Sequence, residues 1–172
     1  MKSGFVNIIG RPNVGKSTLV NALVGERLSI INRKPQTTRH RIIGILNGDD
    51  FQMVFSDTPG LVKDPAYKMH RSMNRFVEGT VEDADVMIFV ADLTDEYKDD
   101  DPIFAILKKV TAPILLVLNK KDCVSPEKVE EMRVWWTTRQ PFLETVSISA
   151  LKKIGTFFNF TNNYLRCNII LI

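Results

Sequence analysis

Cysteine is scarce in this 172-residue chain, which has two, Cys123 and Cys167, with no CxxC pair and no histidine spacing suited to zinc. This scarcity excludes a disulfide-stapled secreted scaffold and favours a reducing, cytoplasmic compartment. Long hydrophobic runs are also missing. The longest wholly apolar runs, Val86–Ala91 and Ile114–Leu118, fall far below the ~20 residues of a membrane-spanning helix. We therefore expect an intracellular domain that builds its core without covalent staples.

Acidic residues are nearly absent from the first third of the chain. Residues 1–48 contain eight lysines and arginines but one acidic residue, Glu26, whereas residues 92–101 contain six acidic residues and one lysine. A concentrated positive field attracts phosphate. We interpret the basic third as a phosphate-facing region with a solvated loop that contacts RNA, and the acidic run as a solvated loop.

Short apolar runs alternate with amphipathic helical patterns along the chain, as is typical of an α/β protein. Apolar runs at 5–9, 86–91, 114–118 and 146–148 are expected to be parallel strands, and Asn47-Gly48-Asp49-Asp50 predicts a hairpin between 42–46 and 52–55. Helical patterns cover 16–24, 73–81 and 103–110, and Ser125-Pro126 opens another helix. The pattern predicts a mostly parallel six-stranded sheet with one antiparallel strand, flanked by about five helices, with ligands at the carboxyl ends of its strands.

A complete GxxxxGKS motif follows the first predicted strand, as Gly10-Arg11-Pro12-Asn13-Val14-Gly15-Lys16-Ser17. Its glycines let the backbone wrap around phosphates, Lys16 is placed to reach the β- and γ-phosphates, and the Ser17 hydroxyl is a ligand for Mg²⁺. A chance glycine-rich turn is the alternative. A strand before the motif and a helix after it favour the phosphate-binding interpretation.

Three further strand ends carry motifs that suit the same ligand. Asp57-Thr58-Pro59-Gly60 supplies a carboxylate partner for Mg²⁺ and a glycine N–H for the γ-phosphate. Asn119-Lys120-Lys121-Asp122 supplies a carboxylate that accepts from the N1–H and exocyclic amine of guanine, groups that adenine lacks on that edge. Ser149-Ala150, after the last predicted strand, can present a backbone N–H to guanine O6. Together the motifs predict a guanine-nucleotide site.

In this order, the four elements resemble those of the translation-factor-related GTPases. Within that class the chain resembles the Era-type family, through residues 10–18, the segment Pro35-Gln36-Thr37-Thr38-Arg39-His40-Arg41 and the DTPGL junction. The resemblance covers about residues 4–151. It implies a P-loop NTPase with a Ras-like G domain that binds GTP and GDP with Mg²⁺. It also implies a role in assembly of the small ribosomal subunit, binding to its RNA, and peripheral contact with the inner face of the membrane.

On this resemblance, residues 26–41 correspond to the first switch and residues 57–69 to the second. Thr38 is our choice for the switch ligand of Mg²⁺, with Thr37 second. The candidate nucleotide-binding residues are Gly10, Arg11, Pro12, Asn13, Val14, Gly15, Lys16, Ser17, Thr18, Asp57, Thr58, Pro59, Gly60, Asn119, Lys120, Asp122, Ser149, Ala150 and Leu151. The candidate Mg²⁺ ligands are Ser17, Thr38 and Asp57, and the candidate catalytic residues are Asn13, Lys16, Thr38 and Gly60.

Leu61 occupies the position at which many GTPases have a glutamine that orients the attacking water. Leucine can neither donate nor accept a hydrogen bond, so we expect slow intrinsic hydrolysis that relies on the phosphate loop, a monovalent cation or a partner. Asn13 is a candidate ligand for K⁺ because related potassium-using GTPases have asparagine there. A local turn hydrogen bond is the equally weighted alternative.

The resemblance ends near Leu151. Era-type chains continue into a KH RNA-binding domain with a GxxG loop, and no such loop follows residue 151 here. We therefore divide the sequence into a G domain at 1–151 and a segment at 152–172 that forms a final helix, with Ile154 on its apolar face, and an atypical tail that is truncated or altered. RNA binding then has less support in the sequence than nucleotide binding.

Four functions are compatible with these motifs, in decreasing order of support. The first is a GTP-hydrolysing switch, and the second is a nucleotide-dependent binding module that barely hydrolyses GTP, which Leu61 favours. A P-loop ATPase or kinase comes third, because Asn119 and Asp122 argue against adenine. A stand-alone RNA-binding protein comes last, supported by the basic first third.

Overall fold

The computed structural model describes residues 2–24, 42–47, 51–57 and 84–155. The elements in chain order are β1 (Lys2–Ile9), α1 (Lys16–Val24), β2 (Ile42–Asn47), β3 (Phe51–Asp57), β4 (Val86–Asp92), α3 (Ile103–Leu107), β5 (Ile114–Asn119), η1 (Lys121–Cys123), α4 (Pro126–Thr137) and β6 (Glu144–Ser147). The strands form a six-stranded sheet of order β2-β3-β1-β4-β5-β6, in which β2 and β3 are antiparallel and every other pair is parallel. The predicted sheet is confirmed.

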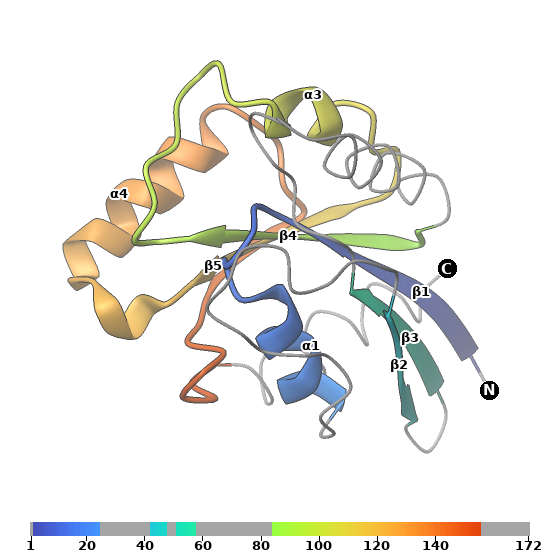
Figure 1. Ribbon diagram of the computed structural model, residues 1–172. Helices are drawn as coiled ribbons and strands as arrows, with labels where there is room; N and C mark the ends of the chain where they lie inside the picture. Colours follow the sequence, from blue (N-terminus) through green and yellow to red (C-terminus); the bar gives the residue numbers. More distant parts are fainter. Residues whose placement is uncertain (1, 25–41, 48–50, 58–83, 156–172) are drawn as a thin grey trace, which may run out of the picture.

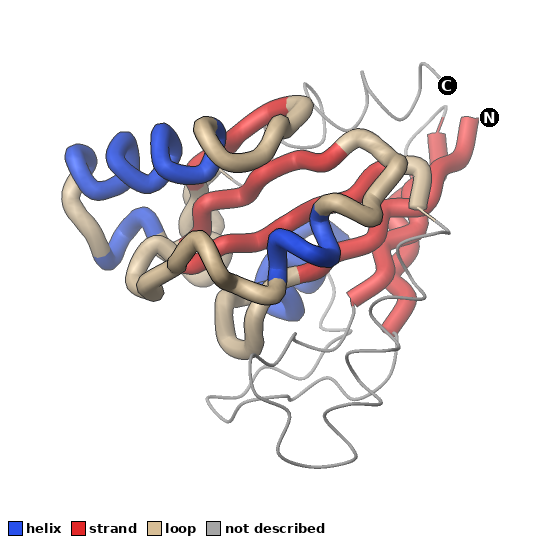
Figure 2. Tube along the Cα trace, turned by 90° about the horizontal axis from the view of Figure 1, so that it is seen from above, coloured by secondary structure: helices blue, strands red, loops and turns tan. Residues whose placement is uncertain are grey.

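The central strands are buried on both faces because helices cover each side (Figure 1). Alternate residues of β4 point to opposite faces: Ile88 packs with α1 and Phe89 packs with α3 and α4. Figure 2, seen from above, shows the strands running side by side, with the short α3 and the longer α4 on the side of the sheet that faces the viewer. Continuous apolar runs such as that of β4, buried at every position, are what a parallel sheet with two covered faces requires.

Helix α4 begins as its sequence predicts. The Ser125 hydroxyl accepts a hydrogen bond from the Lys128 N–H at 3.3 Å, and Pro126 occupies the first turn. Met132 and Trp136 are buried on its inner face, and Trp135 is partly exposed. The ring of Trp136 lies against Phe89 of β4, with centroids 4.8 Å apart, so α4 is anchored to the centre of the sheet.

Two predicted helices fall wholly or mostly outside the described residues. The helix predicted at 73–81 lies outside the described residues, as does most of the helix predicted after residue 152. Ile154, which the sequence pattern assigned to that helix, instead forms an antiparallel bridge with Ser149, and the two residues exchange backbone hydrogen bonds of 3.0 Å. Within the described residues, no helix is long and apolar enough to cross a membrane.

Candidate guanine-nucleotide site

The loop from Gly10 to Gly15 connects β1 to α1 at the carboxyl edge of the sheet. Three of its residues have positive φ angles: Gly10 at 156°, Asn13 at 62° and Gly15 at 99°. At Gly10 a Cβ atom would lie 2.5 Å from the Val90 carbonyl oxygen, so this position needs glycine to pass close to β4. The loop thus has the tight, glycine-dependent curvature that lets backbone N–H groups surround a phosphate.

Lys16 stands at the start of α1 and is buried, with 6% of its surface exposed. Its Nζ donates to the carbonyl oxygens of Gly10, at 3.1 Å, and Arg11, at 2.8 Å. Two backbone oxygens at the beginning of the loop therefore hold the ammonium group. A bound phosphate would place further oxygen acceptors within reach of the same group.

Asn119, the last residue of β5, joins two other parts of the site. Its Nδ2 donates to the Val14 carbonyl at 2.8 Å, and its Oδ1 accepts from the Ala150 N–H at 3.0 Å. The side chain is 3% exposed, so both hydrogen bonds are shielded from water. The phosphate loop, the NKKD segment and the Ser149-Ala150 turn, which are far apart in sequence, are thereby fixed next to one another.

The carboxylate that would recognise guanine lies at the rim of this arrangement. A hydrogen bond with Ser149 lowers the pKa of Asp122 below its ordinary value, with a smaller contribution from Lys152, whose Nζ is 3.3 Å from Asp122 Oδ2. Asp122 is therefore ionised at neutral pH, as acceptance of two N–H groups from a base requires. Lys120 has a left-handed backbone, and its Nζ forms an ion pair with Asp92 at the end of β4.

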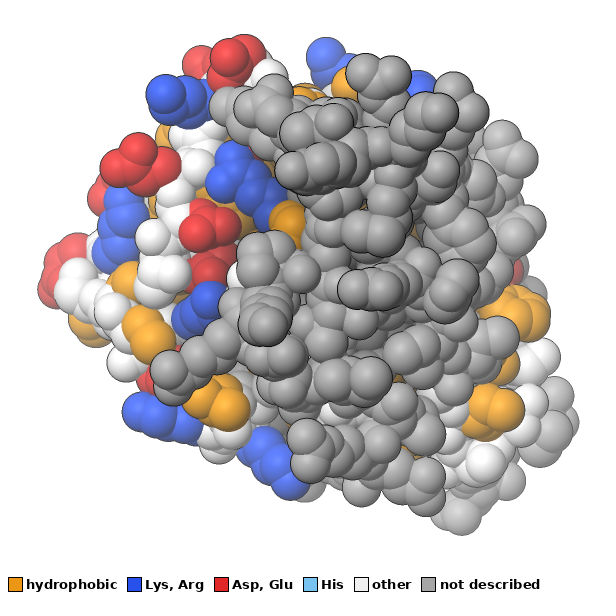
Figure 3. All heavy atoms as spheres, in the orientation of Figure 1, with side chains coloured by type: hydrophobic (Ala, Val, Ile, Leu, Met, Phe, Trp, Pro, Cys, Tyr) orange, Lys and Arg blue, Asp and Glu red, His pale blue; other side chains and the backbone are white. Residues whose placement is uncertain are grey.

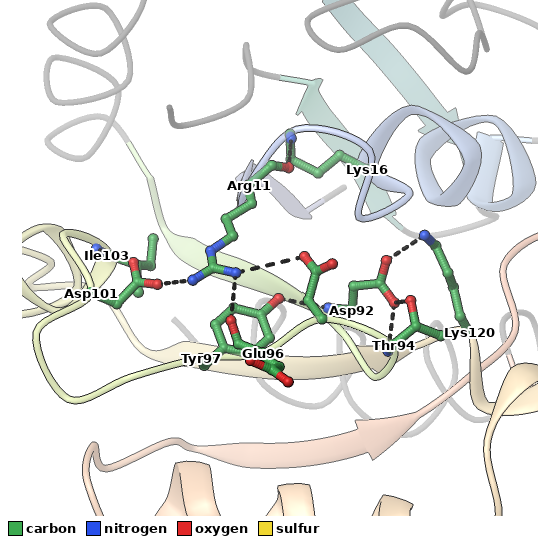
Figure 4. Close-up of polar contacts among 10 residues, drawn as sticks. Arg11, Lys16, Asp92, Thr94, Glu96, Tyr97, Asp101, Ile103 and Lys120 are labelled. Atoms are coloured by element: carbon green, nitrogen blue, oxygen red, sulfur yellow. Dashed lines mark hydrogen bonds and ion pairs between the residues drawn. The ribbon is translucent and has the colours of Figure 1, made fainter. Parts of the chain in front are cut away.

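The acidic run at 92–101 is not simply a solvated loop, and that prediction was wrong at both ends of the run. Asp92 and Asp101 are 3% and 5% exposed. Asp101 forms an ion pair with Arg11, and Asp92 forms one with Lys120, so each carboxylate neutralises a cation of a nucleotide motif (Figure 4). On the described part of the face in Figure 3, acidic and basic side chains lie interspersed.

The Mg²⁺ candidates are described in part. Ser17 lies in the first turn of α1, and the register of β1 and β3 pairs Ile8 with Asp57 at the same edge of the sheet. A hydroxyl and one carboxylate are oxygen donors that suit Mg²⁺, which usually completes its shell with water and phosphate oxygens. No group of three or more His, Cys, Asp or Glu side chains placed to hold a metal occurs in the described part of the chain. The hydroxyl of Ser17 and the carboxylate of Asp57 are donor types that an ion arriving with a nucleotide would need.

Several predicted residues lie outside the described residues, namely Thr38, Thr58, Pro59 and Gly60. Leu151 is described and is 77% exposed beside the Ser149-Ala150 turn. Sequence reasoning missed Asp92 and Asp101 as partners of the site. Asp92 had a signal in its position, because it ends a buried strand next to the strand that ends in Asn119, whereas Asp101 had none.

Comparison with known proteins identifies the family. A family model described as 50S ribosome-binding GTPase matches residues 5–120. The chain is 46% identical over 156 residues to a GTPase Era of Clostridium perfringens, covering 90% of this chain and 52% of the relative. It is 42% identical over 166 residues to GTPase Era of Lactobacillus helveticus, covering 95% and 55%.

Solved structures give the same result. A point variant of Aquifex aeolicus Era bound to GDP.AlF4⁻ superposes with a TM-score of 0.79 at 36% identity, covering 90% of this chain and 53% of that one. An Era complex with MgGDPNP and nucleotides 1506–1542 of 16S ribosomal RNA matches with the same values. The chain spans about half the length of these relatives. The resemblance to Era-type GTPases is confirmed, and the chain belongs to the 50S ribosome-binding GTPase family.

Proposed function

We propose that this chain is a molecular switch that binds GTP and GDP and hydrolyses GTP with Mg²⁺. The observation that carries the proposal is the double hydrogen bond of buried Asn119 to Val14 and Ala150, which joins the phosphate loop to the segments placed to bind a base. A P-loop next to a base-specific carboxylate suits a guanine nucleotide and leaves adenine without partners for Asp122.

Each group has a separable task in this proposal. Asp122 selects guanine, and the loop from Gly10 to Gly15 surrounds the phosphates. The N–H groups of Ser149 and Ala150 donate to Ile154 and Asn119 in this structure, so one of them would exchange that partner for the base. Lys16 moves its hydrogen bonds from the carbonyls of the loop to phosphate oxygens and stabilises charge that develops during phosphoryl transfer. Ser17, Asp57 and Thr38 would hold Mg²⁺, which would supply positive charge against the β- and γ-phosphates.

We propose that hydrolysis by the isolated chain is slow and depends on K⁺ held in part by Asn13. Leu61 cannot orient water, and Asn13 is exposed at the turn of the loop with a φ of 62°. Single-turnover GTP hydrolysis in K⁺ and in Na⁺, with wild type beside Asn13→Ala, tests this. Turnover in K⁺ that is lost in Na⁺ and in the variant is the expected result. Equal, near-zero rates in both salts with GTP bound would contradict it.

That second result would favour the alternative function, a nucleotide-dependent docking module with negligible hydrolysis. The residue after Gly60 supports this alternative, since Leu61 replaces the usual water-positioning glutamine. Exchange of GTP for GDP would then change the surface seen by a partner, without turnover.

The partner we propose is the small ribosomal subunit and its RNA. The support is the similarity to the Era structure that contains a segment of 16S ribosomal RNA, together with the basic first third of the chain. A role in ribosome assembly and a cytoplasmic location, with peripheral contact to the inner face of the membrane, rest on the resemblance to the family.

A further inference from the structure

The segment from Asp92 to Asp101 carries no nucleotide-binding motif itself. It lies against two segments that carry such motifs, the phosphate loop and the NKKD segment. It leaves the end of β4 and leads to α3. Its two terminal carboxylates are buried, whereas Thr94, Glu96 and Asp99 between them are exposed. Burying a carboxylate is costly unless it is paired and hydrogen-bonded, so the contacts of these two residues matter to the site.

Arg11 is the point at which this segment holds the phosphate loop. Its guanidinium forms an ion pair with Asp101, donates to the Glu96 carbonyl at 2.9 Å and lies 4.1 Å from the centroid of the Tyr97 ring (Figure 4). A weaker ion pair joins it to Asp95 at 3.7 Å. Charge, hydrogen bonding and stacking thus direct the side chain into the segment.

Asp101 is itself held in place. Its other carboxylate oxygen, Oδ1, accepts from the Ile103 N–H at 3.0 Å at the start of α3. The carboxylate therefore connects α3 to Arg11. A group with partners on two sides has little freedom to follow a moving loop, so it fixes the position of the arginine.

The backbone of Arg11 carries this restraint to the phosphate site. Its carbonyl oxygen accepts from Lys16 Nζ at 2.8 Å, and three residues further on the Val14 carbonyl accepts from Asn119. The loop is therefore fixed near its beginning through the side chain of Arg11 and near its end through Asn119. Holding a loop in its binding conformation lowers the entropic cost of binding.

We propose that Asp101 is a positioning residue for phosphate recognition, which acts through Arg11 to hold the beginning of the phosphate loop. In this inference, which rests on the proposed function, Arg11 contributes to nucleotide binding through its backbone while its charge is neutralised by Asp101. Replacing Asp101 should therefore weaken binding of the β- and γ-phosphates, which Lys16 is proposed to bind, more than binding of the base.

Asp101→Asn is the most informative variant, because asparagine keeps an oxygen for the Ile103 N–H but loses the ion pair. Arg11→Gln breaks the same pair from the other side. Asp99→Asn is the matched control: Asp99 belongs to the same segment and pairs with an arginine, Arg139, at 2.5 Å, but its side chain is 77% exposed and neither partner belongs to the phosphate loop.

The measurement is the dissociation constant of the 172-residue chain for GDP and for GMP, with thermal unfolding as a check on folding. For Asp101→Asn and Arg11→Gln, we expect GDP affinity to fall about tenfold with little change for GMP. The ratio of the two constants, GMP over GDP, then falls by the same factor. For Asp99→Asn it should stay within about twofold of wild type.

A general loss of stability would weaken both nucleotides together and leave the ratio unchanged. An unchanged ratio in both Asp101→Asn and Arg11→Gln, with wild type binding GDP, would overturn the inference and leave the proposed function intact. A wild-type chain that binds neither GDP nor GMP would overturn the proposed function and the inference with it.

Discussion

Replacing Asn119 by alanine would remove the side chain that joins three segments of the nucleotide site. The Val14 carbonyl and the Ala150 N–H would each lose a hydrogen bond, of 2.8 and 3.0 Å, in a place where the amide is 3% exposed. A buried polar group left without its partner costs about 1–3 kcal/mol, so the two together cost about 2–6 kcal/mol before water enters the space left by the amide.

We expect this cost to be divided between folding and binding. The free energy of unfolding of the nucleotide-free chain should fall by about 2 kcal/mol, because both hydrogen bonds exist before any ligand binds. GDP affinity should fall a further 10- to 100-fold, since the ligand must then order the loop and the Ser149-Ala150 turn as it binds. Urea unfolding and fluorescence titration with GDP measure the two quantities separately.

Asn47→Ala is the matched control for this prediction. Asn47 also accepts a side-chain hydrogen bond, from Gln52 Nε2 at 2.8 Å, but it is exposed at the end of β2. Its replacement should change the free energy of unfolding by less than about 0.5 kcal/mol. If Asn119→Ala changed the free energy of unfolding and the GDP affinity as little as Asn47→Ala does, the two hydrogen bonds of Asn119 would not hold the site together, and the reasoning would be refuted.

Three further predictions follow from the same geometry. Asp122→Asn should reduce GDP affinity and raise affinity for xanthosine diphosphate, because an amide can donate to the 2-carbonyl of xanthine; competition titration measures both, and unchanged preference would contradict the assigned base contact. Burial raises the pKa of Tyr97 above 10.0, so the unfolded state ionises first and the free energy of unfolding should fall as the pH rises above about 10. In Tyr97→Phe, the free energy of unfolding, measured by urea unfolding at each pH, should fall less steeply above pH 10. A pH profile identical to that of wild type would contradict this prediction. Gly10→Ala would bring a Cβ to 2.5 Å from the Val90 carbonyl, so it should lower the thermal midpoint and weaken GDP binding, and retention of both would show that the loop can shift.

The sheet could be predicted because its signals are local. Apolar runs such as Val86–Ala91 and Ile114–Leu118, and the turn residues after Asn47, report strands and a hairpin directly. The end of the chain was less predictable. Ile154 suits the apolar face of a helix by spacing, but Ser149 provides a backbone partner that the pattern of side chains does not reveal.

The nucleotide motifs could be identified because phosphate and guanine demand particular residues at fixed spacings. The residues that hold these motifs in place could not be identified in the same way. The pairing of Arg11 with Asp101 joins residues 90 positions apart, and nothing in the local sequence of either one indicates the other. A run of acidic residues is usually solvated, and only the folded chain shows that Asp101, at the far end of this run, is buried.

Equilibrium binding of GDP and of ADP to the 172-residue chain, with Mg²⁺ present, would decide whether this fold holds a guanine-nucleotide site. The arrangement of Asn119, Asp122 and the phosphate loop predicts saturable binding of GDP, with ADP weaker by about a thousandfold or more because it leaves the Asp122 carboxylate unpaired. Equal affinity for the two nucleotides, or no binding of GDP by the folded chain, would contradict that assignment.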